Sequence, residues 1–155
     1  ILIDPTAFIH PKAHVEGSVI GARTKVWQFA SITRGARIGA DCVIAPGAMI
    51  DGSHVGDGSK IGPGTKMGPS FRIGRKVFIG PNCTLCNDCW PVADGPGFDM
   101  DRLLSGGFVS VRIDDGASIG ANAVILPGVV IGEGAFVAAG AHGMTPLAVG
   151  SNCSH

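Results

Sequence analysis

The sequence predicts a parallel β-helix, in which short strands wind around a triangular core. The first observation is an apolar residue at almost every sixth position. That period fits neither a helix, at about 3.6 residues, nor a two-faced strand, at about 2.0. The second observation is a small residue two positions before most of these apolar anchors, and the third is a glycine directly after many of them. Each such hexapeptide forms one strand and a corner, and three of them close one coil.

The anchors define about six coils in an all-β domain spanning residues 1–155. They are Ile9, Val15, Ile20, Val26, Ile32, Ile38, Ile44, Ile50, Val55, Ile61, Met67, Ile73, Ile79, Leu85, Ile113, Ile119, Ile125, Ile131 and Val137. Taking three anchors per coil gives three stacked faces. The first stacks Val15, Ile32, Ile50, Met67 and Leu85. The second stacks Ile20, Ile38, Val55 and Ile73. The third stacks Ile9, Val26, Ile44, Ile61 and Ile79.

The residues around each anchor are expected to shape the corners. Small residues such as Ala36 and Ser59 precede the anchors by two positions and must fit inside a corner. Glycines follow anchors, as in Ile38-Gly39 and Ile61-Gly62. We expect these glycines to turn the backbone with positive φ, a conformation that costs glycine little.

The repeat is interrupted once, and we expect residues 88–112 to form a long loop extruded from a corner of the prism. The segment contains Trp90, two prolines and four aspartates. A long stretch without secondary structure inside a compact domain is usually functional or disordered. An alternative is a tolerated insertion without a role. Residues 141–155 depart from the repeat and are expected to form an irregular tail.

Charge and composition narrow the functional classes. Lysine plus arginine equals aspartate plus glutamate at 12 each, so the formal net charge is zero. Neither bulk nucleic-acid binding nor membrane-surface binding is implied. The longest apolar stretches fall short of the ~20 residues that span a bilayer, and residues 1–10 lack the zones of a signal peptide. We therefore expect a cytoplasmic protein.

Cysteine spacing raises a metal site as an alternative. Five cysteines, an odd number, fit a reducing compartment better than a disulfide framework. Cys83, Cys86 and Cys89 have the spacing C-x2-C-x2-C, but Cys83 falls on the small inward position of the repeat, as Cys42 does. Cysteine packs there as a small apolar residue. No metal site is expected.

Outward columns mark possible binding faces. The residues just before the anchors of the second face are Val19, Arg37, His54 and Arg72. Three stacked basic or potentially basic side chains suit phosphate or pyrophosphate. The alternative is a solvated ladder without a ligand.

The corresponding column of the third face is apolar enough to pack on a symmetry mate. Its residues are Phe8, Lys25, Val43, Lys60 and Phe78. A flat-faced prism of this type suits a closed three-fold ring.

Three stretches carry a family resemblance: VWQFASITRGARIGADCVI, IGPNCTLCNDCWPVA and DDGASIGANAVILPGVVIGEGAFVAAGA. The chain resembles the hexapeptide-repeat acyltransferases of the left-handed β-helix class. Within them it is most similar to enzymes that acetylate the 3-amino group of a nucleotide-linked sugar, of the UDP-2-acetamido-3-amino-2,3-dideoxy-glucuronate N-acetyltransferase type. The resemblance implies a homotrimer that binds acetyl-coenzyme A (acetyl-CoA) between neighbouring prisms and a nucleotide sugar near the extruded loop.

The resemblance also assigns residues. Asn87 takes the position that contacts the reacting amine, and Asp88, Trp90 and Pro91 follow as in the family. Gln28 stands in a W-x-F site that often carries histidine, and Val92 replaces a common arginine. Small residues of the late coils are implied to let coenzyme A approach the backbone: Gly120, Ala121, Ala138 and Ala139.

The chemistry of acetyl transfer constrains these roles. An unprotonated amine must attack the thioester, the developing oxyanion needs donors, and a group must accept a proton. The Asn87 side chain can accept a hydrogen bond from the amine but is no strong base. Water, the departing thiolate or Asp88 is left to take the proton, and His54 and His142 are further alternatives.

Two other functions remain open from the sequence. One is a zinc enzyme resembling the γ-class carbonic anhydrases, although His10, His14, His54, His142 and His155 lack that family's H-x4-H pair. The other is a non-catalytic scaffold, because repeat regularity serves the core whatever the function. The polar insertion that begins beside Asn87 favours a substrate site.

Overall fold

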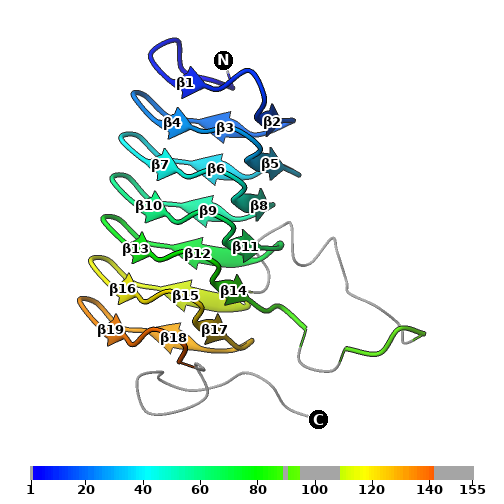
Figure 1. The fold of residues 1–155 in the computed structure, drawn as a ribbon, viewed down its shortest axis with the longest axis vertical. Helices are drawn as coiled ribbons and strands as arrows, with labels where there is room; N and C mark the ends of the chain where they lie inside the picture. The colour runs from blue at the N-terminus through cyan, green and yellow to red at the C-terminus, as the bar shows by residue number, and fades with distance from the viewer. Residues whose placement is uncertain (1, 89–90, 95–108, 142–155) are drawn as a thin grey trace.

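The computed structural model describes residues 2–88, 91–94 and 109–141, which form a three-sided prism of stacked coils (Figure 1). All regular structure in these residues is β, in short parallel strands. Each coil passes through three sheets in turn. The left-handed parallel β-helix of about six coils that the sequence predicts is confirmed.

The strands divide into three parallel sheets. Sheet 1 contains β1 (Phe8–Ile9), β4 (Lys25–Val26), β7 (Val43–Ile44), β10 (Lys60–Ile61), β13 (Phe78–Ile79), β16 (Ser118–Ile119) and β19 (Phe136–Val137). Sheet 2 contains β2 (His14–Val15), β5 (Ser31–Thr33), β8 (Met49–Asp51), β11 (Lys66–Met67), β14 (Thr84–Leu85) and β17 (Val124–Ile125). Sheet 3 contains β3 (Val19–Ile20), β6 (Arg37–Ile38), β9 (His54–Val55), β12 (Phe71–Ile73), β15 (Val111–Ile113) and β18 (Val130–Ile131).

Every predicted anchor lies in a strand of its own, and the three predicted faces are the three sheets. The register pairs each anchor with the anchor one coil away, as in Ile44 with Ile61 and Ile61 with Ile79. Most anchors are almost fully buried, and together they form one continuous core. The hydrophobic effect of this inward ladder is therefore distributed evenly along the prism axis.

The predicted role of the glycines after the anchors is wrong. Gly39 and Gly62 do not have positive φ; the left-handed position is usually the third residue after an anchor, as at Asp41 (φ 56°) and Gly64 (φ 71°). A Cβ on Gly62 would lie 2.5 Å from the carbonyl carbon of Gly80 in the next coil. These glycines are needed because successive coils approach each other closely at this point, not because the chain turns there.

Small inward residues fill the corners and satisfy backbone groups of the next coil. The Thr65 hydroxyl donates to the Gly80 carbonyl at 2.8 Å and accepts from the Cys83 amide at 3.1 Å. Cys42 and Cys83 are buried in the same position, and the Cys83 thiol donates to the Gly120 carbonyl at 3.1 Å. Their sulfur atoms thus belong to the interior of the helix, as the repeat predicts.

The insertion leaves the stacking intact. The chain departs after β14 at the corner between sheets 2 and 3 and re-enters at β15. β12 pairs directly with β15, and β14 pairs with β17, so the coils close as if the insertion were missing. Residues 91–94 are exposed and lie outside the prism (Figure 1). No helix with the length and apolarity to cross a membrane occurs in the described ranges.

Candidate functional site

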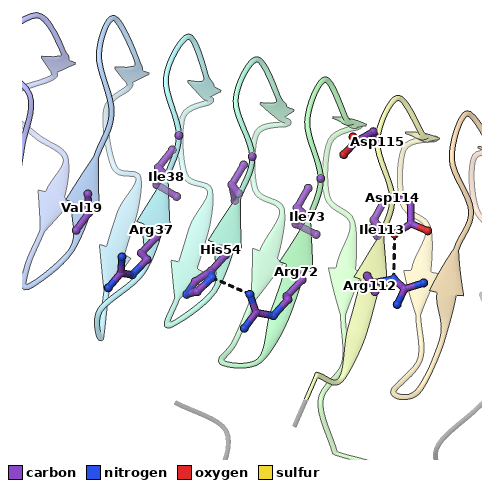
Figure 2. Close-up of a pocket in the computed structure, with 14 residues that line it drawn as sticks. Val19, Arg37, Ile38, His54, Arg72, Ile73, Arg112, Ile113, Asp114 and Asp115 are labelled. Atoms are coloured by element: carbon purple, nitrogen blue, oxygen red, sulfur yellow. Dashed lines mark hydrogen bonds and ion pairs between the residues drawn. The ribbon is translucent and has the colours of Figure 1, made fainter. Parts of the chain in front are cut away.

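Sheet 3 presents a basic ladder to the outside. Arg37 on β6 is in register with His54 on β9, and His54 is in register with Arg72 on β12. These three predicted residues therefore lie side by side on consecutive coils. The structure adds Arg112 on β15, which is in register with Arg72 (Figure 2). We call Arg37, His54, Arg72 and Arg112 the basic ladder.

The sequence prediction of this column ends at Arg72, before the insertion, and so lacks Arg112. The two arginines are neighbours in the sheet although 40 positions separate them in the chain, since the insertion lies between their strands. Arg112 directly precedes the anchor Ile113, which is the outward position of the repeat. Extending the column past the insertion by this rule would have found it.

The ladder borders a groove of about 430 Å³. Gly39, Gly56 and Gly74 also line it. The Asp57 carboxylate lies against Gly39 and the Asp115 carboxylate against Gly74. Asp114 and Asp115 line the groove at the Arg112 end. The groove is thus basic along three coils and mixed in charge at the fourth.

Hydrogen bonds differentiate the members of the ladder. Arg72 Nη1 lies 3.2 Å from His54 Nδ1, and because a guanidinium can only donate, Nδ1 is the acceptor. Burial lowers the pKa of His54, and the charges of Arg72 and Arg37 lower it further. His54 is therefore neutral near pH 7 and carries its hydrogen on Nε2. Arg112 Nε donates to Asp114 Oδ1 at 2.9 Å.

The depressed pKa of His54 predicts a pH dependence of stability. Unfolding restores the ordinary value of about 6.5, so below it the unfolded chain binds more protons than the folded chain, and stability falls with falling pH. We expect His54→Gln to reduce the loss of Tm between about pH 8 and about pH 5.5. His14→Gln, at an exposed residue of sheet 2, is the control. An unchanged pH profile of Tm in His54→Gln would contradict the assignment.

Asn87 lies at the corner where the insertion begins, two residues after β14. Its side chain is half-buried, and Nδ2 donates to the Pro69 carbonyl at 3.2 Å. A Cβ added to Gly68 would lie 2.9 Å from this Nδ2. The amide is therefore held by its nitrogen, which leaves the carbonyl oxygen Oδ1 to accept from another group. Asp88 follows directly and is also half-buried.

The late-coil residues Gly120, Ala121, Ala138 and Ala139 stack on one another at the corner between sheets 1 and 2. A Cβ on Gly120 would overlap the backbone nitrogen of Ala139. Ala121 accepts from the Gly140 amide at 2.8 Å, and Ala138 and Ala139 are exposed. The corner therefore carries only small side chains, and Gly120 is required there by the close approach of the next coil.

One chain does not bring all the predicted residues together. Gln28 follows β4 at the corner between sheets 1 and 2, three coils away from Asn87 and on another edge of the prism. The late-coil stack is also on that other edge, and the basic ladder occupies the face of sheet 3. Trp90 and His142 lie outside the described residues.

Metal-binding chemistry has no cluster to build on in the ranges that the structure describes. Those residues contain no group of three or more His, Cys, Asp or Glu that could hold an ion. His10 and His14 flank the corner between β1 and β2 in the first coil, whereas His54 lies on β9 of sheet 3. Burial raises the pKa of the Cys86 thiol, which disfavours the thiolate that a metal would need.

Comparisons with known proteins place this architecture. The acetyltransferase domain of PglB from Neisseria gonorrhoeae FA1090 matches with a TM-score of 0.60 and 22% identity, over 88% of this chain and 53% of that one. The same domain with acetyl coenzyme A gives 0.54 and 20%, over 91% and 52%. PerB from Caulobacter crescentus, in complex with CoA and GDP-perosamine, gives 0.53 and 17%, over 88% and 50%.

These likenesses show the fold, and the chain spans about half the length of the structures it matches. No curated protein matches the chain in sequence. The model of the family "Bacterial transferase hexapeptide (six repeats)" matches residues 17–52, 52–87 and 110–142, which is most of the chain. The chain belongs to the bacterial hexapeptide transferase family.

Proposed function

We propose that this chain transfers the acetyl group of acetyl-CoA to the amino group of a nucleotide-linked sugar. The observation that carries the proposal is Asn87, whose amide is fixed by the Pro69 carbonyl at the point where the insertion leaves the prism. Membership of a transferase family supports the reaction class. Solved structures of the same fold bind acetyl coenzyme A, or CoA with GDP-perosamine, which supports the two substrates.

The reaction assigns Asn87 an orienting role. Its Oδ1 accepts a hydrogen bond from the sugar amine, whose lone pair attacks the thioester carbonyl carbon. The new C–N bond forms, the C–S bond breaks, and CoA leaves as the thiolate. The amine loses one proton, which passes to Asp88, to water or to the thiolate. An amide cannot take that proton at neutral pH, so Asn87 positions the nucleophile and does not deprotonate it.

A trimer would complete the site that one chain leaves divided. Asn87 and the late-coil stack lie on different edges of the prism, so a groove between two copies would bring the Asn87 of one copy toward Gly120 and Ala139 of the next. The outward column of sheet 1 supports contact between copies, because Phe8 and Phe78 expose 43% and 48% of their surface. We propose a closed homotrimer on these grounds.

Binding calorimetry separates this proposal from a scaffold function. Titrations of the whole chain with CoA and with a panel of amino-sugar nucleotides are expected to show saturable binding of both substrate classes. Gel filtration with light scattering is expected to give the mass of three chains. If the chain binds neither CoA nor any amino-sugar nucleotide, a non-catalytic β-helix is favoured. If a chelator-free preparation contains stoichiometric zinc, the zinc-enzyme alternative is favoured.

Gly68 is expected to act as a positioning residue for Asn87. In Gly68→Ala the new methyl group meets Asn87 Nδ2 at 2.9 Å and must displace the amide. We expect kcat to fall by about tenfold with the KM for acetyl-CoA unchanged, because the interaction lost belongs to the chemical step. Gly132→Ala is a matched control, since Gly132 also follows an anchor and no atom of the residues that the structure describes lies within 4 Å of its added Cβ. Equal kcat values for the two variants would contradict the prediction.

A further inference from the structure

We propose that the groove beside the basic ladder of sheet 3 binds a diphosphate. In the free protein Asp114 pairs with Arg112, and the bound anion displaces this carboxylate. The inference rests on the proposed function only for the source of the diphosphate, because both acetyl-CoA and a nucleotide sugar carry one. The groove is distinct from the Asn87 corner and the late-coil stack. The groove is formed by outward residues of this chain, and the hexapeptide repeat does not require these residues to be basic.

Basic side chains gather on this sheet and not on the other two. The outward column of sheet 1 places Lys25 and Lys60 on either side of Val43, and that of sheet 2 contains Lys66 between Met49 and Thr84. On sheet 3, four basic or potentially basic residues follow one another without interruption. Neighbouring strands are about 4.8 Å apart, so the guanidinium groups of Arg72 and Arg112 on adjacent strands repel each other, and an anion between them would relieve this repulsion.

The pairing of the arginines points the same way. Arg23 pairs with Asp41 at 2.7 Å, and Arg34 lies 3.4 Å from Asp51. Within the described ranges no ion pair engages Arg37, nor Arg75 outside the ladder, and Arg72 is joined to a neutral imidazole. The two coils that flank the His54 coil thus hold guanidinium groups without an acid. A guanidinium binds phosphate oxygens through two parallel N–H groups, which makes this arrangement suitable for a diphosphate.

His54 adds a further element of a site. The two carboxylates nearest the glycines of the groove are engaged by the backbone, because Asp57 accepts from the Ala40 amide and Asp115 from the Arg75 amide, both at 2.8 Å. His54 accepts from Arg72 through Nδ1, and this fixes its hydrogen on Nε2 as a donor. The imidazole can therefore donate to a phosphate oxygen while neutral.

Arg112 extends the ladder by one coil, and in the free protein it is paired with an acid. Its Nε donates to Asp114 Oδ1 at 2.9 Å, and both side chains border the groove (Figure 2). An exposed ion pair of this type contributes little stability, so a doubly charged ligand can compete with the single carboxylate. Arg112 would then turn from Asp114 to the nearer phosphate of the diphosphate.

Calorimetric titration with inorganic pyrophosphate tests the site without any sugar or acetyl group. We expect Arg37→Gln/Arg72→Gln to weaken binding by about tenfold or more. Lys25→Gln/Lys60→Gln removes the same charge from sheet 1 and is expected to change the affinity by less than about twofold at moderate salt. The proposal is overturned if the wild type does not bind pyrophosphate, or if both double variants weaken binding equally. Thermal unfolding of each variant verifies that it is folded.

Two single variants test Arg112 in the same titration. Asp114→Asn releases Arg112 and is expected to tighten pyrophosphate binding by about threefold, whereas Arg112→Gln is expected to weaken it by a similar factor. If both variants bind pyrophosphate with the affinity of wild type, Arg112 does not contact the anion and does not exchange Asp114 for it.

Titrations with CoA, UDP and GDP identify the source. If the groove holds the nucleotide sugar, Arg37→Gln/Arg72→Gln weakens UDP or GDP and spares CoA; if it holds acetyl-CoA, the pattern reverses. If Arg37→Gln/Arg72→Gln binds CoA, UDP and GDP as tightly as wild type, the groove does not bind either substrate. If the protein binds pyrophosphate but transfers no acetyl group, the proposed function is refuted and the diphosphate site stands. If Arg37→Gln/Arg72→Gln transfers acetyl groups as fast as wild type at substrate concentrations below KM, the diphosphate site is refuted and the proposed function stands.

Discussion

Replacing Asn87 with alanine is expected to lower kcat for acetyl transfer by on the order of 100-fold, because a misplaced nucleophile loses the advantage of orientation. The Asn87 amide is held by Pro69 through its nitrogen, and its oxygen is the group that would align the amine. CoA affinity, measured by calorimetry, should stay within about twofold of wild type, since Asn87 acts in the chemical step.

Two further variants sharpen this expectation. Asn87→Asp keeps an acceptor but places a carboxylate oxygen against the Pro69 carbonyl, so it too should be strongly impaired. Thr84→Ala changes an exposed residue on the preceding strand β14 and should behave as wild type. Full turnover in Asn87→Ala would reject the assignment and direct attention to Asp88, His54 and His142.

Truncating a central anchor should give the largest loss of stability. Ile61 on β10 is 1% exposed and is stacked between Ile44 and Ile79. We expect Ile61→Ala to reduce the free energy of unfolding by about 2–5 kcal/mol, because a cavity opens in a core that cannot collapse around it. Denaturant unfolding followed by circular dichroism measures the change.

Lys60→Ala is the matched control for Ile61→Ala. Lys60 precedes Ile61 on the same strand and points outward, so its truncation should change the free energy of unfolding by less than about 0.5 kcal/mol. Similar losses in the two variants would contradict the inward and outward alternation on which the fold depends.

The fold was predictable because its information is local. Each hexapeptide contains an anchor such as Ile38 and a small corner residue such as Ala36, and stacking repeats the same contact from coil to coil. The role of the glycines after the anchors was not predictable. The repeat shows that a small residue is required there, but it does not show which atom a larger side chain would clash with. The close approach of Gly62 to Gly80 is a relation between coils and appears only in three dimensions.

The candidate site was predictable only in part. The ladder positions Arg37, His54 and Arg72 follow from the outward register, and the structure brings them together. The hydrogen bond that fixes the Asn87 amide depends on Pro69, which lies 18 positions earlier and one coil away. Neither the period nor the spacing specifies such a contact. The separation of Asn87 from the late-coil stack likewise follows from which corner each occupies.

Release of free CoA from acetyl-CoA, monitored against a panel of amino-sugar nucleotides, tests the central claim most directly. We predict saturable release with at least one amino sugar, a product heavier by one acetyl group, and no release with the corresponding sugar that carries a hydroxyl in place of the amine. Release of CoA with none of the amino sugars, or equal release with the hydroxyl compounds, would contradict transfer to an amine.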